Sequence, residues 1–194
     1  MINKVLTVLK NQLNAPDGLW DPNVPNEIEI AVVDDIAKHD ESTEGLNNKV
    51  VISLLNIEEE STLKNRSRYQ QVVVDNHPVR YDKESTPAYL NLYVIISANR
   101  STYSKSLLSI SKVIEIFQAK NVLEYVDLEP ENNFSFRIEL HSVPFEQLSY
   151  IWGLLGGKIM PSALYKISVI KIAAKEVIPV QLINDVNIKS IKVD

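Results

Sequence analysis

Few residues of this chain have the types and spacing that catalysis or metal binding requires. The three histidines, His39, His77 and His141, are isolated in the sequence, and there is no cysteine. A zinc site needs several His, Cys or carboxylate ligands, most often as closely spaced pairs. The absence of cysteine excludes thiolate metal sites, iron–sulfur clusters, disulfides and thiol nucleophiles. We therefore predict no metal centre and no cofactor.

The acidic run Glu58-Glu59-Glu60 is the strongest candidate for a reactive or cation-binding group. If a strand continues through it, Glu58 and Glu60 lie on one face, where two carboxylates could hold a hard cation or act as an acid–base pair. The alternative, which we favour, is that these three residues are simply the solvent-exposed end of a buried strand. A metal-dependent hydrolase that uses Glu58, Glu60 and a histidine stays open as the lesser possibility.

Glycine usage argues against a phosphate-binding loop and a serine hydrolase. Phosphate loops need clustered glycines ahead of a helix, because only backbone without Cβ brings several N–H groups close to an anion. Among five glycines there is one pair, Gly156-Gly157, and it follows a predicted helix. The Gly-x-Ser-x-Gly spacing of α/β-hydrolases is also missing. The sequence therefore predicts a protein that is not an enzyme.

The composition is that of a soluble globular domain long enough to bury a core. The chain has 194 residues, of which 45% are hydrophobic and 23% are charged. No apolar stretch approaches the length of a membrane helix, about eighteen residues, and charge interrupts the apolar N-terminus, unlike a secretory signal. We expect a protein that is assembled in the cytoplasm and binds no membrane.

The net charge of −5 is unevenly distributed along the chain. Residues 21–60 contain eleven acidic and two basic residues, whereas residues 61–120 contain four acidic and nine basic residues. No segment has the dense Lys and Arg content of a nucleic-acid binder, so we expect no nucleic-acid partner. Patches of opposite sign could attract successive copies of one subunit at a head-to-tail interface. A dipolar solvated surface is the alternative.

Three stretches have the spacing of amphipathic helices. Residues 2–13 place apolar side chains at steps of three and four. A second helix begins after Ser101, its expected N-cap, and a third begins at Pro144 and ends at Gly156-Gly157. The expected inward stripes are Tyr103, Leu107, Ile110, Ile114 and Phe117 in the second helix, and Phe145, Leu148, Trp152 and Leu155 in the third.

Five further stretches are expected to be strands, and a sixth is a possible one. Residues 49–57 and 88–98 are apolar on both faces, which is typical of interior strands in a sheet covered on both sides. Residues 27–36 and 163–173 are also strand-like, and residues 69–75 could form half of a hairpin within an otherwise aperiodic connection. Residues 134–140 alternate as a strand near an edge does, with Phe134, Phe136, Ile138 and Leu140 inward.

These elements predict an α/β protein with a single domain, a mixed β-sheet flanked by about three helices, over residues 1–174. Residues 175–194 form a β-prone C-terminal tail that could pair with a partner or with the chain's own sheet. Trp152 is expected in the core. Trp20 lies in a proline-rich connection and is the better candidate for contact with another chain.

Three stretches, in this order along the chain, resemble a known family. They are residues 48–65 (NKVVISLLNIEEESTLKN), residues 89–94 (YLNLYV), and residues 145–158 (FEQLSYIWGLLGGK) running on to 161–166 (PSALYK). Together they resemble the cap, or tail-terminator, proteins of phage-tail-like contractile injection systems of the antifeeding-prophage type. The resemblance covers most of residues 1–172.

The resemblance implies a tail-terminator-like fold and a structural role in place of a reaction. It implies a homohexameric ring on the distal end of the inner tube and sheath, which ends their growth, in a particle that can be released from the cell. The implied partners are further copies of the chain, the tube protein and the sheath protein. A baseplate or tube-initiating adaptor of the same machine is the alternative.

We expect contacts with other subunits, tube or sheath in the irregular segments 14–26 and 58–87 and in the C-terminal tail. A terminator must offer a surface complementary to the last tube ring while offering nothing that would let another ring add. The candidate interface residues are Trp20, Glu58, Glu60, Arg66, Arg68 and Tyr69.

Overall fold

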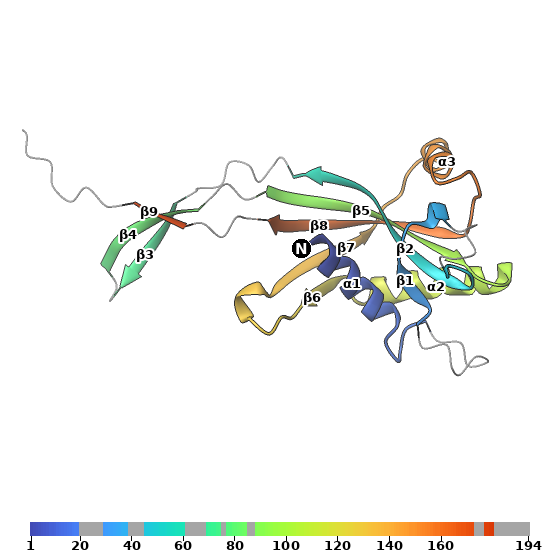
Figure 1. The fold of residues 1–194 in the computed structure, drawn as a ribbon, viewed down its shortest axis with the longest axis horizontal. Helices are drawn as coiled ribbons and strands as arrows, with labels where there is room; N and C mark the ends of the chain where they lie inside the picture. Colours follow the sequence, from blue (N-terminus) through green and yellow to red (C-terminus); the bar gives the residue numbers. More distant parts are fainter. Residues whose placement is uncertain are drawn as a thin grey trace, which may run out of the picture. The chain divides into compact units, whose positions relative to one another are not determined.

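The computed structural model describes residues 1–19, 29–38, 45–60, 69–74, 77–84, 88–172 and 177–180 (Figure 1). The chain divides into two compact units. The first contains Met1–Glu59 and Leu90–Ile170, and the second contains Glu60–Tyr89 and Lys171–Asp194. Each unit thus combines segments that are far apart in the sequence. The domain boundary expected after residue 174 stays a prediction.

A six-stranded sheet organises the first unit. Its strands are β1 (Ala31–Val33), β2 (Lys49–Glu59), β5 (Ala88–Asn99), β6 (Val122–Tyr125), β7 (Phe134–Leu140) and β8 (Ser162–Ile172). Their order across the sheet is β1-β2-β5-β8-β7-β6, so the two strands expected in the interior, β2 and β5, do lie there. β1 pairs with β2 in parallel, while the β2–β5, β7–β8 and β6–β7 pairs are antiparallel. The sheet is therefore mixed, as predicted.

A three-stranded sheet lies in the second unit. Its strands are β3 (Tyr69–Val74), β4 (His77–Glu84) and β9 (Val177–Val180), in the order β3-β4-β9. β3 and β4 form an antiparallel hairpin. This confirms the prediction that residues 69–75 form half of a hairpin, and β4 is the other half. β9 pairs with β4, with Val180 opposite Tyr81. Part of the tail thus pairs within its own chain.

The described residues contain three α-helices: α1 (Ile2–Leu13), α2 (Tyr103–Ala119) and α3 (Phe145–Leu154). The predicted α/β class with about three helices is confirmed. Thr102, and not the expected Ser101, caps α2, because its hydroxyl accepts a hydrogen bond from the Lys105 N–H at 3.3 Å. After α3, Gly156 and Gly157 adopt φ values of 98° and 79°, the left-handed conformation that ends a helix.

α2 and α3 pack on opposite faces of the sheet. Successive residues of a strand point to opposite faces, so neighbours in β8 indicate which helix covers which face. The Tyr165 ring meets the Phe117 ring of α2 edge-on, with the centroids 5.4 Å apart. Leu164, the preceding residue, packs instead in a cluster with Trp152 of α3. The ribbon shows the two helices on either side of the strands (Figure 1).

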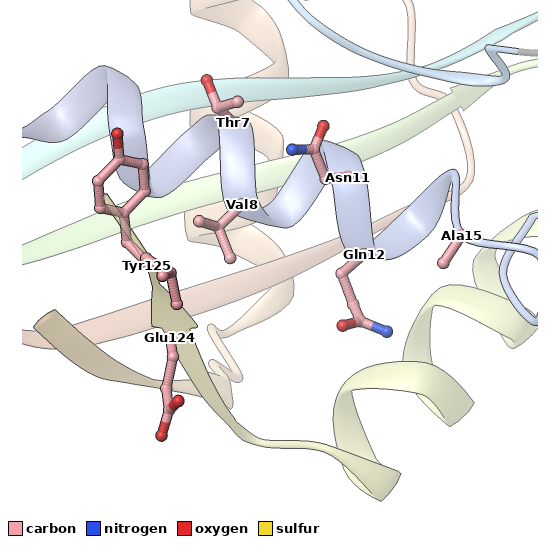
Figure 2. A pocket seen from close by; sticks show the side chains of 8 residues that line it. Thr7, Val8, Asn11, Gln12, Ala15, Glu124 and Tyr125 are labelled. Carbon is pink, nitrogen blue, oxygen red and sulfur yellow. The ribbon is translucent and has the colours of Figure 1, made fainter. Parts of the chain in front are cut away.

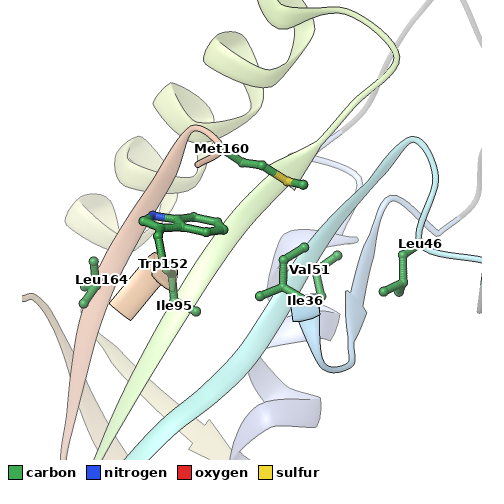
Figure 3. Close-up of a cluster of buried hydrophobic side chains, with 7 residues drawn as sticks. All are labelled: Ile36, Leu46, Val51, Ile95, Trp152, Met160 and Leu164. Atoms are coloured by element: carbon green, nitrogen blue, oxygen red, sulfur yellow. The ribbon is translucent and has the colours of Figure 1, made fainter. Parts of the chain in front are cut away.

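The core beneath α3 is built around Trp152, whose side chain is 1% exposed (Figure 3). Its helix neighbours Leu148 and Ile151 are partly buried against the same cluster. The prediction that Trp152 is a core residue is confirmed. The buried members of the cluster are Ile36, Leu46, Val51, Ile95, Trp152, Met160 and Leu164.

The inward stripe expected for α2 is wrong over its first two turns. Tyr103 and Leu107 are exposed, and the small Ser106 is buried in place of Leu107. Ser106, Ile110, Val113 and Phe117 also follow helical steps of three and four, so spacing alone could not choose between two overlapping stripes.

The structure also corrects one strand length, two side-chain positions and one missing strand. The strand expected over residues 27–36 is limited, within the described range, to Ala31–Val33, and the 3-10 turn η1 (Ile36–Lys38) follows it. Phe145 of α3 and Leu140 of β7 are exposed where inward positions were expected. β6 was not expected at all, and it takes the sheet edge beside β7.

Candidate interaction surfaces

α3 presents large apolar side chains to solvent on the side away from the sheet. Tyr150 and Leu154 are one helical turn apart, and they are 75% and 88% exposed. Phe145, in the first turn, is 78% exposed as well, but it lies seven residues before Trp152 and therefore on the sheet-facing side of the helix. We call Tyr150 and Leu154 the α3 patch. Grouped exposed apolar side chains of this kind mark interaction sites in soluble proteins.

A second apolar surface lies at the start of α2. Tyr103, Leu107 and Leu108 are exposed there, with Leu108 68% accessible to solvent. We call these three residues the α2 patch. Since α2 and α3 cover opposite faces of the sheet, the two patches lie on opposite sides of the first unit.

Sequence reasoning missed both patches because it assigned apolar residues of helices to the core. One signal was available for α3. Tyr150 and Leu154 fall outside the stripe expected to be buried, so their large side chains had no inward place. An apolar residue off the buried stripe of a helix is therefore a useful sign of an interface.

The structure describes three of the six residues that the sequence nominated as interface candidates. Glu58 is exposed near the end of β2, where Asn56 Nδ2 donates to its carboxylate at 3.2 Å. Glu60 belongs to the second unit, in which its N–H donates to the Tyr89 carbonyl at 2.7 Å. Tyr69 is the first residue of β3. Trp20, Arg66 and Arg68 lie outside the described residues.

Asp34 and Asp35 have structural roles at the turn that follows β1. No group of three or more His, Asp or Glu side chains converges within the part of the chain that the structure describes. Asp34 Oδ1 accepts from the Asp35 N–H, and Asp35 Oδ1 accepts from the Ala37 N–H, so these carboxylates stabilise the turn at η1.

An open groove of about 350 Å³ runs between α1 and the edge strand β6 (Figure 2). Glu124 and Tyr125 are the ionisable members of its lining. The rest of the lining is neutral, so the groove offers mainly polar and apolar contacts to another molecule. The lining residues are Thr7, Val8, Asn11, Gln12, Ala15, Glu124, Tyr125 and Val126.

A charged network ties α1 to the connection after β6. Lys4 Nζ donates to Asp127 Oδ2 at 2.7 Å, and the Tyr125 hydroxyl donates to the same oxygen at 3.1 Å. The hydrogen bond from Lys4, followed by that from the Glu129 N–H, lowers the pKa of Asp127 from its ordinary 3.8 to about 2. Asp127 raises the pKa of Lys4 in return. Both groups are therefore charged at neutral pH.

The network predicts a pH-dependent effect of Asp127→Asn. Because the pKa of Asp127 is depressed in the folded protein, its ionised form stabilises the fold above pH 3.8 and less as the pH falls towards about 2. Urea unfolding of the two proteins should show a stability deficit of the variant at pH 7 that shrinks below pH 4 or so. A deficit of the same size at pH 7 and near pH 2 would contradict this.

The comparison with known families decides where this fold belongs. Residues 4–183 match the family described as the Pvc16 N-terminal domain. The chain belongs to this family. The resemblance first seen in residues 48–65, 89–94 and 145–166 is thereby confirmed. Among curated protein sequences, none matches the chain.

Two solved structures share the fold of this Pvc16 N-terminal domain. One is the PVC sheath/tube terminator of an extracellular contractile injection system, in its extended state, with a TM-score of 0.65 and 13% identity. The match covers 100% of this chain and 65% of that one. The other is the anti-feeding prophage cap, a tube-terminating cap, with a TM-score of 0.58, 11% identity, and coverage of 97% and 60%.

The chain spans 65% and 60% of the lengths of those two proteins. At such low identities the likeness establishes the fold of the Pvc16 N-terminal domain, and the tasks of those proteins pass to this chain only as a proposal. None of the helices in the described ranges has the length and apolar character that crossing a membrane demands.

Proposed function

We propose that this chain is the structural cap of a contractile injection system. In this proposal a homohexameric ring binds the distal end of the inner tube and sheath, and ends the growth of both. The observation that carries it is the fold, which corresponds over 100% of the chain to a sheath/tube terminator. The family match over residues 4–183 supports it independently.

The physical basis of capping is an interface that is used once. A tube grows because each ring reproduces on its far side the surface to which it has just bound. A cap binds the last such surface and offers a different one outward, so no further ring can add. This task requires shape and exposed contact surfaces, and the described part of the chain supplies these in the α2 patch, the α3 patch and the α1–β6 groove.

The proposal includes partners, location and chemistry. The cap acts without catalysis, assembles in the cytoplasm, and leaves the cell as part of a released particle. Its partners are further copies of itself, the tube protein and the sheath protein. Residues 1–174 form the terminator-like domain, and residues 175–194 form a tail.

Contacts between subunits, tube and sheath follow from charge and from the candidate interface residues in this proposal. The acidic segment 21–60 of one subunit attracts the basic segment 61–120 of the next. The residues that contribute contacts are Trp20, Glu58, Glu60, Arg66, Arg68 and Tyr69.

Deleting the gene in the strain that makes the particles tests this function. We expect electron micrographs to show tubes and sheaths of variable and increased length, with open ends, because nothing stops ring addition. A plasmid copy of the wild-type gene should restore uniform length. Particles of normal length with closed tips in the deletion strain would overturn the proposal.

The position of the protein in the particle separates the cap from its alternatives. Labelled protein should be found at the end opposite the baseplate, and label at the baseplate end would favour the adaptor. Elemental analysis of the purified chain tests whether the protein is a metal-dependent hydrolase. A stoichiometric metal whose removal blocks particle assembly would count against a purely structural cap.

A further inference from the structure

The two apolar patches have matching chemistry and opposite positions. The α3 patch presents Tyr150 and Leu154, and the α2 patch presents Tyr103 and Leu108. Tyrosine is among the residues that most often anchor protein interfaces, because it combines a large apolar ring with a hydroxyl group. Each patch is therefore suited to bind the other, but within one subunit the sheet separates them.

A head-to-tail ring can use two patches that lie on opposite sides of one subunit. Around a cyclic ring each subunit uses two different surfaces, one towards the preceding copy and one towards the following copy. The neighbouring β8 residues Leu164 and Tyr165 place α3 and α2 on opposite faces of one sheet, so the patches point in different directions from a single unit. A contact between two α3 patches would close a dimer and leave both α2 patches exposed.

Charge on the two helices favours the same pairing. Glu146 is the charged residue of α3, one turn before Tyr150. α2 carries Lys105, Lys112 and Glu115, a net charge of +1, and Lys112 Nζ pairs with Glu115 Oε1 at 2.9 Å within the helix. Helices of opposite net charge attract, whereas two copies of the same helix repel each other.

We propose that the α3 patch of one subunit binds the α2 patch of the next copy of this chain and that this contact closes the cap ring. The inference rests on the proposed function, since it names the subunit interface of that ring. Burial of both patches removes the apolar surface that each isolated subunit exposes. In this ring, the sheet of each subunit lies between the preceding copy and the following copy of the chain.

Two charge substitutions, one in each patch, test the head-to-tail contact. Leu154→Lys disables the α3 patch, and Leu108→Glu disables the α2 patch. Each variant alone should be monomeric in sedimentation velocity, with self-association weakened at least about 100-fold against wild type, because the new charge would be buried against a helix of the same charge. An equimolar mixture retains one intact pair of patches and should therefore associate at least to dimers.

Leu128→Glu is the matched control, because Leu128 is 100% exposed and outside both patches. It should assemble as wild type does, and circular dichroism should show all three variants folded. Wild-type protein that stays monomeric at about 100 µM, assembly of either variant alone, or a mixture without dimers would overturn the proposal. Ring assembly and tube length are separate readouts, so loss of this interface with normal capping would leave the proposed function standing.

Discussion

Trp152→Ala is expected to lower the free energy of unfolding by about 3–5 kcal/mol, the range observed when a buried aromatic is truncated. Trp152 is 1% exposed and lies between α3 and the sheet, where it contacts a cluster that includes Val51 and Ile95. The substitution leaves a cavity in the core that holds α3 on the sheet. Urea unfolding followed by circular dichroism measures the loss.

Two variants on the same helix serve as controls for Trp152→Ala. Tyr150→Ala removes another large aromatic from α3, but Tyr150 is 75% exposed, so the free energy of unfolding should change by about 0.5 kcal/mol or less. Trp152→Phe should lower the free energy of unfolding much less than Trp152→Ala does. An aromatic ring still fills most of the space, and the buried indole Nε1–H that is removed has no hydrogen-bond partner among the described residues. Equal losses for Trp152→Ala and Tyr150→Ala would contradict the position of this core.

Asn14→Ala is expected to lower the free energy of unfolding by about 2 kcal/mol, because three hydrogen bonds of about 0.5–1.5 kcal/mol each are lost. Asn14 Oδ1 accepts from the N–H groups of Ile30 and Ala31 at 3.0 and 2.8 Å, and its Nδ2 donates to the Ala31 carbonyl at 2.8 Å. β1 is an edge strand, and Ala31 is 0% exposed. The side-chain amide thus satisfies edge groups that water does not reach.

Asn11→Ala is the matched control for Asn14→Ala. It changes the same residue type in α1, one turn before the C-cap Asn14, but Asn11 is exposed, and alanine has the higher helix propensity. Its free energy of unfolding should be unchanged or slightly raised. Asn14→Asp keeps the acceptor oxygen and loses the donor, so it should fall between wild type and Asn14→Ala. A stability loss as large for Asn11→Ala as for Asn14→Ala would show that the amide bridge to β1 contributes nothing.

Long elements with an unambiguous apolar period were predictable from the sequence alone. α1 was expected over residues 2–13 and is found at Ile2–Leu13. β5 and β8 were expected from continuous apolar runs and are found within one or two residues of the expected ends. In these segments local preference and burial favour the same structure, so neighbours in space were not needed to decide it.

Short or polar elements were not predictable. β6 has four residues, too few for a periodic signal, and it is a strand because β7 pairs with it from Val122 to Tyr125. β4 contains Pro78 and several charged residues, and its pairing with β3 and β9 decides its conformation. Hydrogen bonding to a distant partner overrides weak local preference in such segments.

The family and the candidate surfaces also differ in how far the sequence predicts them. The three family-like stretches were enough to predict the family, because residue types and their order are properties of the chain itself. Which apolar side chains of α2 and α3 stay exposed was decided only by tertiary structure. Helical spacing defines a stripe, but contact with the sheet determines which stripe is buried, and therefore that Trp152 is core while Tyr150 and Leu154 remain available to a partner.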